Sequence, residues 1–217
     1  MNKDGIEALI DALASQAEPV QPLRAPWSRA LVTVGLMTLI GGVAVALVAS
    51  VNPFATGERG QWLAALEMMA MFATGVLGIT AAFHLSVPGR SKTWIAAPIP
   101  PFVAWLLLSG IGCYRDFLTN GPDGMGLGHS VDCLLFIAAA SLLVGGPLLW
   151  RLSRARPIDP LPVAFAAGLG AAALSALLLQ FFHPFAVTFI DLAVHVAAIL
   201  LVVGLASLLS RKTLRPA

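Results

Sequence analysis

Charged residues are scarce in this chain. Only 11% of its 217 residues are Asp, Glu, Lys or Arg, whereas 58% are hydrophobic. A soluble domain of this length would have too few charges to cover its surface, so the composition excludes an ordinary soluble protein. The net charge of +2 is no indication of nucleic-acid binding, and we expect no direct nucleic-acid partner.

The usual signatures of catalysis are also absent. The sequence has no Gly-rich phosphate loop, no HExxH zinc motif, no nucleophile elbow and no DNA-binding motif. We therefore expect neither an enzyme nor a permanently bound cofactor. No convincing internal repeat is present either, which weakens the case for a transporter built from related halves.

Long apolar runs are what the sequence does contain. Each of six runs has about 20 residues or more, enough for a helix to cross a hydrocarbon core of about 30 Å. The runs are Ala30–Val51, Trp62–Leu85, Trp94–Cys113, Ser130–Trp150, Leu161–Phe182 and Ile190–Ser210. We predict an all-α polytopic membrane protein, with a head and tether at residues 1–23 and a six-helix transmembrane domain at residues 24–217.

The distribution of positive charge predicts the orientation of these helices. Of the 13 Lys and Arg residues, eleven fall on one side of the six-pass threading, and only Arg59 and Arg115 fall on the other. Positively charged loops resist translocation, so we expect the eleven-residue side, with both termini, to be cytoplasmic. The eleven are Lys3, Arg24, Arg29, Arg90, Lys92, Arg151, Arg154, Arg156, Arg211, Lys212 and Arg215.

The head has the pattern of a short amphipathic helix. Ile6, Leu9, Ile10 and Leu13 are spaced to form one apolar stripe. The stripe could lie on the bilayer surface. However, the other face of the helix is acidic and an anionic leaflet would repel it. We therefore favour a groove on a protein partner as its binding site.

The two cysteines are the next candidate site. The predicted third helix ends at Cys113 and the fourth begins near Cys133, so they bracket the loop at residues 114–132 on the predicted extracytoplasmic side. They could form a static disulfide there, remain inert thiols, or form a responsive thiol site. His129 lies four residues before Cys133, on the same helical face. Imidazole and thiolate together suit a transient Zn²⁺, Cu⁺ or Cd²⁺ ion.

A second polar cluster is predicted at the same edge. His183 ends the fifth helix, and Asp191 and His195 are spaced i and i+4 in the sixth. Ionisable groups in an apolar span are costly, so they pair with each other or mark a functional site. Asp191 and His195 could lock helices together or extend the metal site, and Glu67 on the second helix could face them.

Two further features concern the helices themselves. His84 comes just before the turn at residues 85–90 and is expected to cap its helix at the cytoplasmic side. Gly168, Ala172 and Ala176 form a small-xxx-small row, which lets a neighbouring helix approach closely.

The chain resembles the negative-regulator-of-sigma-F family, six-pass membrane anti-sigma factors of proteobacteria. The resemblance runs nearly end to end, and the order and spacing of several short motifs carry it. These are Leu9–Ala14, Pro19–Leu23, Leu85–Arg90, Gly112–Asp116, Gly128–Ser130 with Cys133, His183-Pro184 and Asp191–His195.

The resemblance implies a protein of the bacterial inner membrane that holds an extracytoplasmic-function sigma factor and releases it on an envelope signal. It also implies that Cys113 and Cys133 sense metal or oxidative stress. The alternatives are a small metal-ion transporter or channel, disfavoured because the polar groups crowd at one edge, and a thiol oxidoreductase, disfavoured because no CxxC motif is present.

Overall fold

The computed structural model describes residues 3–16, 23–48, 61–121, 130–182 and 188–214, and this part of the chain is helical without strands. The helices are α1 (Lys3–Ser15), α2 (Pro26–Val48), α3 (Gln61–Leu85), the 3₁₀ helix η1 (Lys92–Ala96), α4 (Ile99–Asn120), α5 (Ser130–Ser153), α6 (Pro160–Leu179) and α7 (Phe189–Thr213).

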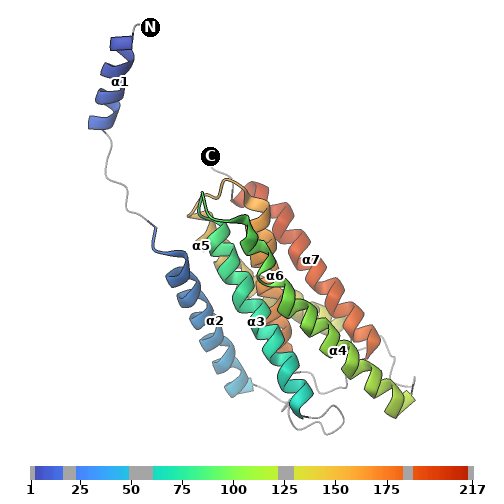
Figure 1. Ribbon diagram of the computed structural model, residues 1–217. Helices are drawn as coiled ribbons and strands as arrows, with labels where there is room; N and C mark the ends of the chain where they lie inside the picture. The colour runs from blue at the N-terminus through green and yellow to red at the C-terminus, as the bar shows by residue number, and fades with distance from the viewer. Residues whose placement is uncertain (1–2, 17–22, 49–60, 122–129, 183–187, 215–217) are drawn as a thin grey trace.

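Six helices in the described ranges are long and apolar enough to cross a membrane, which confirms the predicted six-helix, all-α architecture. They run up and down in a bundle (Figure 1). The start of α2 and the ends of α3, α5 and α7 lie at one end, which we call the basic end because Arg29, Arg90 and Arg151 lie there. The opposite end, with Cys113 and Cys133, is the cysteine end.

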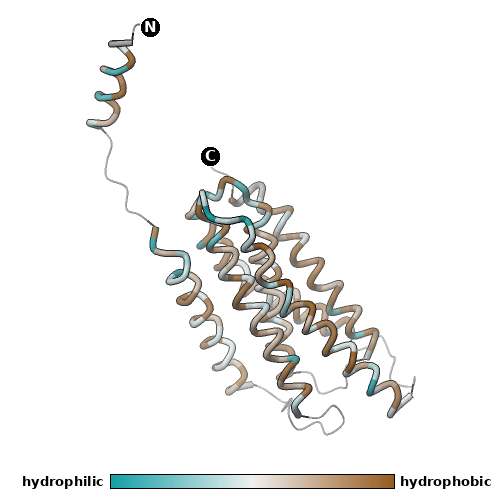
Figure 2. The backbone as a smooth tube through the Cα atoms, in the orientation of Figure 1, coloured by the Kyte–Doolittle hydropathy of each residue, from teal (hydrophilic) through white to brown (hydrophobic). Residues whose placement is uncertain are grey.

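The hydropathy of the residues follows this arrangement. Figure 2 shows hydrophobic residues along the lengths of the bundle helices, with hydrophilic residues mainly at the ends of the bundle and on α1. Many large apolar side chains of the bundle are exposed, including Leu31, Leu143 and Leu208. Exposed leucines on this scale fit a surface that faces lipid rather than water.

Helix α6 is the centre of the bundle. It packs against α3, α5 and α7 and has the largest buried share of the six spans. Its contact with α3 is made by glycines: a Cβ atom on Gly78 would come within 2.8 Å of the Gly170 Cα atom. Gly168, from the predicted small-residue row, faces α7 instead, where a Cβ atom would meet the Val203 Cα atom at 3.1 Å. Small residues therefore bring two neighbours close to α6.

One predicted helix boundary was wrong, and one helix extends beyond its apolar run. Helix α2 begins at Pro26, four residues before the apolar run Ala30–Val51, because proline is favoured in the first turn of a helix. Helix α4 continues past Cys113 to Asn120 and ends at Gly121, whose φ of 71° suits glycine. The polar residues after Cys113 suggest a loop, but polar residues are equally compatible with the last turns of a helix.

Candidate thiol site at the cysteine end

Cys113 and Cys133 are both buried in the structure and neither forms a disulfide. Their side chains are 1% and 2% exposed. Cys113 lies on α4, well inside the helix, and Cys133 lies in the first turn of α5. Cys133 is part of an apolar cluster with Met71, Trp105 and Ile137, so its thiol is held among well-packed side chains.

The N-terminus of α7 connects the surroundings of both cysteines. The Cys113 Sγ atom donates a hydrogen bond to the Thr188 carbonyl oxygen at 3.4 Å. The negative charge of Asp191, one turn into α7, acts on the Cys133 thiol together with that of Asp132. Thr188 and Asp191 therefore link a helix that carries one cysteine to a helix that carries the other.

Thr188 and Asp191 are themselves fixed by a capping box. The Asp191 backbone N–H donates to Thr188 Oγ1 at 3.3 Å, and the Thr188 backbone N–H donates to Asp191 Oδ2 at 3.0 Å. The Thr188 hydroxyl also donates to Asp191 Oδ2 at 2.9 Å. These bonds satisfy backbone groups that have no partner within the helix, and the carboxylate suits the positive end of the helix dipole.

The expected pairing of Asp191 with His195 takes a different form. His195 Nδ1 lies 2.6 Å from the Asp191 backbone oxygen, whereas the Asp191 carboxylate is used in the cap. Both side chains are buried. The i and i+4 spacing thus fixes the imidazole against its own helix.

A buried hydrogen bond between a serine and a glutamate lies one turn deeper. The Ser109 hydroxyl donates to Glu67 Oε1 at 2.5 Å and joins α4 to α3. Ser109 is four residues before Cys113, so the two share a face of α4. Glu67 thus lies close to the cysteine end, as expected, and has a hydrogen-bond partner within the apolar span.

The predicted metal ligands are only partly described. His129 and His183 lie outside the described residues. Within the described ranges, no group of three or more His, Cys, Asp or Glu side chains is placed to hold a metal ion. Cys113 contacts the start of α7, and the charge of Asp191 acts on Cys133, but the metal site remains a prediction.

The head displays its predicted stripe. Ile6, Leu9, Ile10 and Leu13 all lie on α1 and all are exposed, with Leu9 at 50%. Helix α1 lies apart from the bundle (Figure 1). The apolar stripe is thus accessible to a partner.

Sequence reasoning missed an aromatic cluster at the basic end. His84 lies in the last turn of α3, but it is only 2% exposed and stacks on Trp94 with ring centroids 4.0 Å apart. The Trp27 ring meets both of them edge-on. Neither ring nitrogen of His84 has a hydrogen-bond partner among the described residues, so the expected cap does not form. The only signal in the sequence was the position of Trp27 and Trp94, each of which lies near the start of a long helix.

Comparisons with known proteins give a family for almost the whole chain. The model of the family described as "Negative regulator of sigma F" matches residues 13–215. Most of the head, including Ile6, Leu9 and Ile10, lies before the matched region.

One curated relative also matches in part. A lipoprotein signal peptidase of Syntrophomonas wolfei is 32% identical over 103 residues, which is 47% of this chain and 66% of the relative. The chain thus spans just under two thirds of that protein's length. No solved structure matches this chain.

Proposed function

Because the chain belongs to the negative-regulator-of-sigma-F family, we propose that it is an integral-membrane anti-sigma factor with a sensor for envelope stress. In this proposal it holds an extracytoplasmic-function sigma factor at the cytoplasmic face of the bacterial inner membrane. Metal binding or oxidation at Cys113 and Cys133 then releases the sigma factor. The family match over residues 13–215 is the observation that carries the proposal.

The exposed head supports the part of the proposal that concerns sigma binding. Its apolar stripe faces away from any core, and Glu7 and Asp11 are exposed on the same short helix. A helix of 13 residues is marginally stable alone in water. Binding in an apolar groove of the sigma factor would stabilise the helix, and its acidic side chains would face basic residues of the partner.

The position of the thiols supports the sensor. The buried Cys113 thiol donates to Thr188 of the cap that holds the start of α7, and the charge of Asp191 in the same cap acts on the buried Cys133 thiol. A two-electron oxidant such as a peroxide would take two protons and two electrons from the thiols as a disulfide forms. Cys113 would then no longer donate to Thr188, and the cap would shift.

Helix α7 offers a route from this site to the other end of the membrane. It runs from the cap at Thr188 to the buried Leu214 and packs along α5 and α6. Packed helices respond to a shift at one end by moving as rigid bodies rather than by bending smoothly. A displaced cap would therefore change the surface at the basic end, where the sigma factor is held.

Affinity capture tests the function. The protein is solubilised in detergent from its native host, captured, and the co-purifying soluble proteins are identified by mass spectrometry. We expect one sigma factor in near-stoichiometric amount, and its release when the captured complex is treated with peroxide or Cd²⁺. Capture of a correctly inserted protein without any sigma factor would contradict the proposal.

A further inference from the structure

Two arginines from distant parts of the chain meet at the basic end. Arg29 Nη2 donates to the Arg151 backbone oxygen at 3.2 Å, and Arg151 Nη1 donates to Thr33 Oγ1 at 2.8 Å. The Thr33 hydroxyl in turn donates to the Arg29 backbone oxygen at 2.7 Å. The Arg29 guanidinium also lies 4.7 Å from the centre of the Phe83 ring. The two side chains are therefore held in place between α2, α3 and α5.

Their charges are not balanced. Among the described residues neither arginine has a carboxylate partner, and the ion pair found at this end joins Lys92 to Asp159 instead. Within the described ranges Arg29 Nη1 is buried without a hydrogen-bond partner, and the positive charge of Arg151 acts on Arg29. Two positive charges held close together, one of them with an unused hydrogen-bond donor, favour the binding of an anion.

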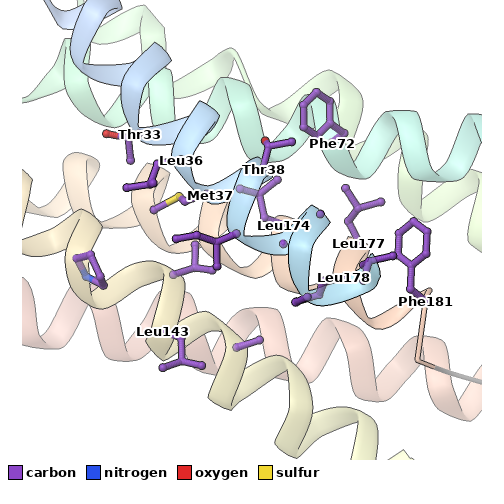
Figure 3. A pocket seen from close by; sticks show the side chains of 18 of the residues that line it. Thr33, Leu36, Met37, Thr38, Phe72, Leu143, Leu174, Leu177, Leu178 and Phe181 are labelled. Atoms are coloured by element: carbon purple, nitrogen blue, oxygen red, sulfur yellow. The ribbon is translucent and has the colours of Figure 1, made fainter. Parts of the chain in front are cut away.

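An apolar groove starts beside this pair, at Thr33 and Arg151. It has a volume of about 720 Å³ and lies between α2, α5 and α6 (Figure 3). Thr33 lies at one end of the groove and Phe181 at the other (Figure 3). Of the residues that line it, all within the described part of the chain, only Arg151 is charged. The walls are otherwise mostly aliphatic, as at Leu143 and Leu178.

The length of the groove matches one leaflet. Along α2 its lining runs from Thr33 to Val45, which at 1.5 Å per residue is roughly 18 Å. One half of a hydrocarbon core is about 15 Å thick. A phosphate at the arginine pair would therefore have an acyl chain of the same leaflet lying along the groove.

We propose that this groove binds one anionic phospholipid, with its phosphate at Arg29 and Arg151 and an acyl chain between α2, α5 and α6. Basic pockets between transmembrane helices are typical sites for anionic headgroups. Helix α1 fits the groove poorly, because its acidic side chains would face hydrocarbon. The proposal does not depend on sigma binding, so either can fail without the other.

Native mass spectrometry tests the proposal on the full chain, delipidated in detergent and titrated with phosphatidylglycerol or phosphatidylethanolamine. We expect one phosphatidylglycerol to bind and to survive activation better than phosphatidylethanolamine. R29Q and R151Q should each weaken phosphatidylglycerol binding by about fivefold. K92Q removes an exposed charge at the same end and should leave the binding unchanged.

A second pair of variants tests the acyl chain without touching the arginines. Gly41 lines the groove, and a Cβ atom there would lie 3.9 Å from Leu178 Cδ1, so G41L should fill the groove and exclude the lipid. Gly35 also lies on α2, in open space and outside the groove lining, so G35L is the matched control. Equal binding of the two lipids, equal effects of R151Q and K92Q, or equal effects of G41L and G35L would overturn the proposal. A dimer that G41L abolishes would also overturn it, because a second copy would then fill the groove.

Discussion

At the scale of single residues, the two cysteines have different surroundings. Cys113 makes a hydrogen bond to a backbone carbonyl of the α7 cap, whereas Cys133 packs in an apolar cluster near two carboxylates. The thiol proton of Cys113 can be replaced by a serine hydroxyl proton with the same partner. Serine at position 113 therefore removes thiol chemistry while this hydrogen bond is kept, and serine at position 133 is the smallest change that removes the second sulfur atom.

We expect C113S and C133S each to abolish induction of the sigma-dependent genes by Cd²⁺ and by peroxide, and to leave basal repression intact. A disulfide or a two-thiolate site needs both sulfur atoms, so either single change is sufficient. A sigma-dependent reporter measures the response, and immunoblots check protein abundance. H129A should weaken the response to Cd²⁺ more than the response to peroxide, because only a metal would use the imidazole.

The double serine variant gives the decisive outcome for this prediction. If it still responds to Cd²⁺ at normal abundance, the cysteines are structural and the sensor lies elsewhere. S109A is a useful control at the same end of α4, because it removes a hydroxyl that is hydrogen-bonded to Glu67 but no thiol.

At the scale of the elements, α1 and α7 have opposite characters. Helix α7 is held at its start by a capping box and packs along two neighbours, so it can transmit a displacement. Helix α1 is exposed along its described length, so a partner is needed to bury its stripe. The proposed function assigns transmission of the signal to the packed helix α7 and sigma binding to the exposed helix α1.

We expect L9D to release the sigma factor and to switch on its genes without any signal. Burying a carboxylate in an apolar groove costs several kcal/mol, and about 1.4 kcal/mol already weakens binding tenfold. The control is A8D, which places the same charge on the opposite face of α1. Captured sigma factor is measured for both variants, and equal amounts at equal protein levels would show that the stripe is not the binding surface.

At the scale of the whole molecule, the arrangement of charge predicts how the bundle sits in the membrane. The basic end carries Arg29, Arg90, Arg151 and Arg154, whereas the described part of the cysteine end has Arg115, stacked over Trp62 with 5.6 Å between the guanidinium carbon and the ring centre. An asymmetry of this size favours one orientation during insertion, with the basic end in the cytoplasm.

Reporter fusions test this orientation. Fusions after Arg90, after Arg156 and at Ala217 should report cytoplasm, and fusions near Gly57, Asn120 and Pro184 should report the outside. Alkaline phosphatase and a fluorescent protein used in parallel give opposite signals for each side. A cytoplasmic signal at Asn120 would place both thiols in a reducing compartment and would remove the basis of the sensing proposal.

The helical spans and the amphipathic head could be predicted from the sequence because both depend on local properties. Hydropathy over about 20 residues decides whether a segment can cross a membrane, and a spacing of three and four residues decides which side chains share a helical face. The sequence also singled out both cysteines, Asp191 and His195, since polar and thiol groups near the ends of apolar runs are conspicuous.

Only the tertiary structure decided which of these groups meet. Cys113 contacts Thr188, 75 residues further along the chain, and Arg151 contacts Thr33 at a separation of 118 residues. Such contacts depend on which helices are neighbours, and close packing of Gly78 on Gly170 helps to set this. Local hydropathy is high in all six spans, and it does not say which helices are neighbours. The cap between the thiols and the groove beside the arginines therefore became visible only once the helices were packed.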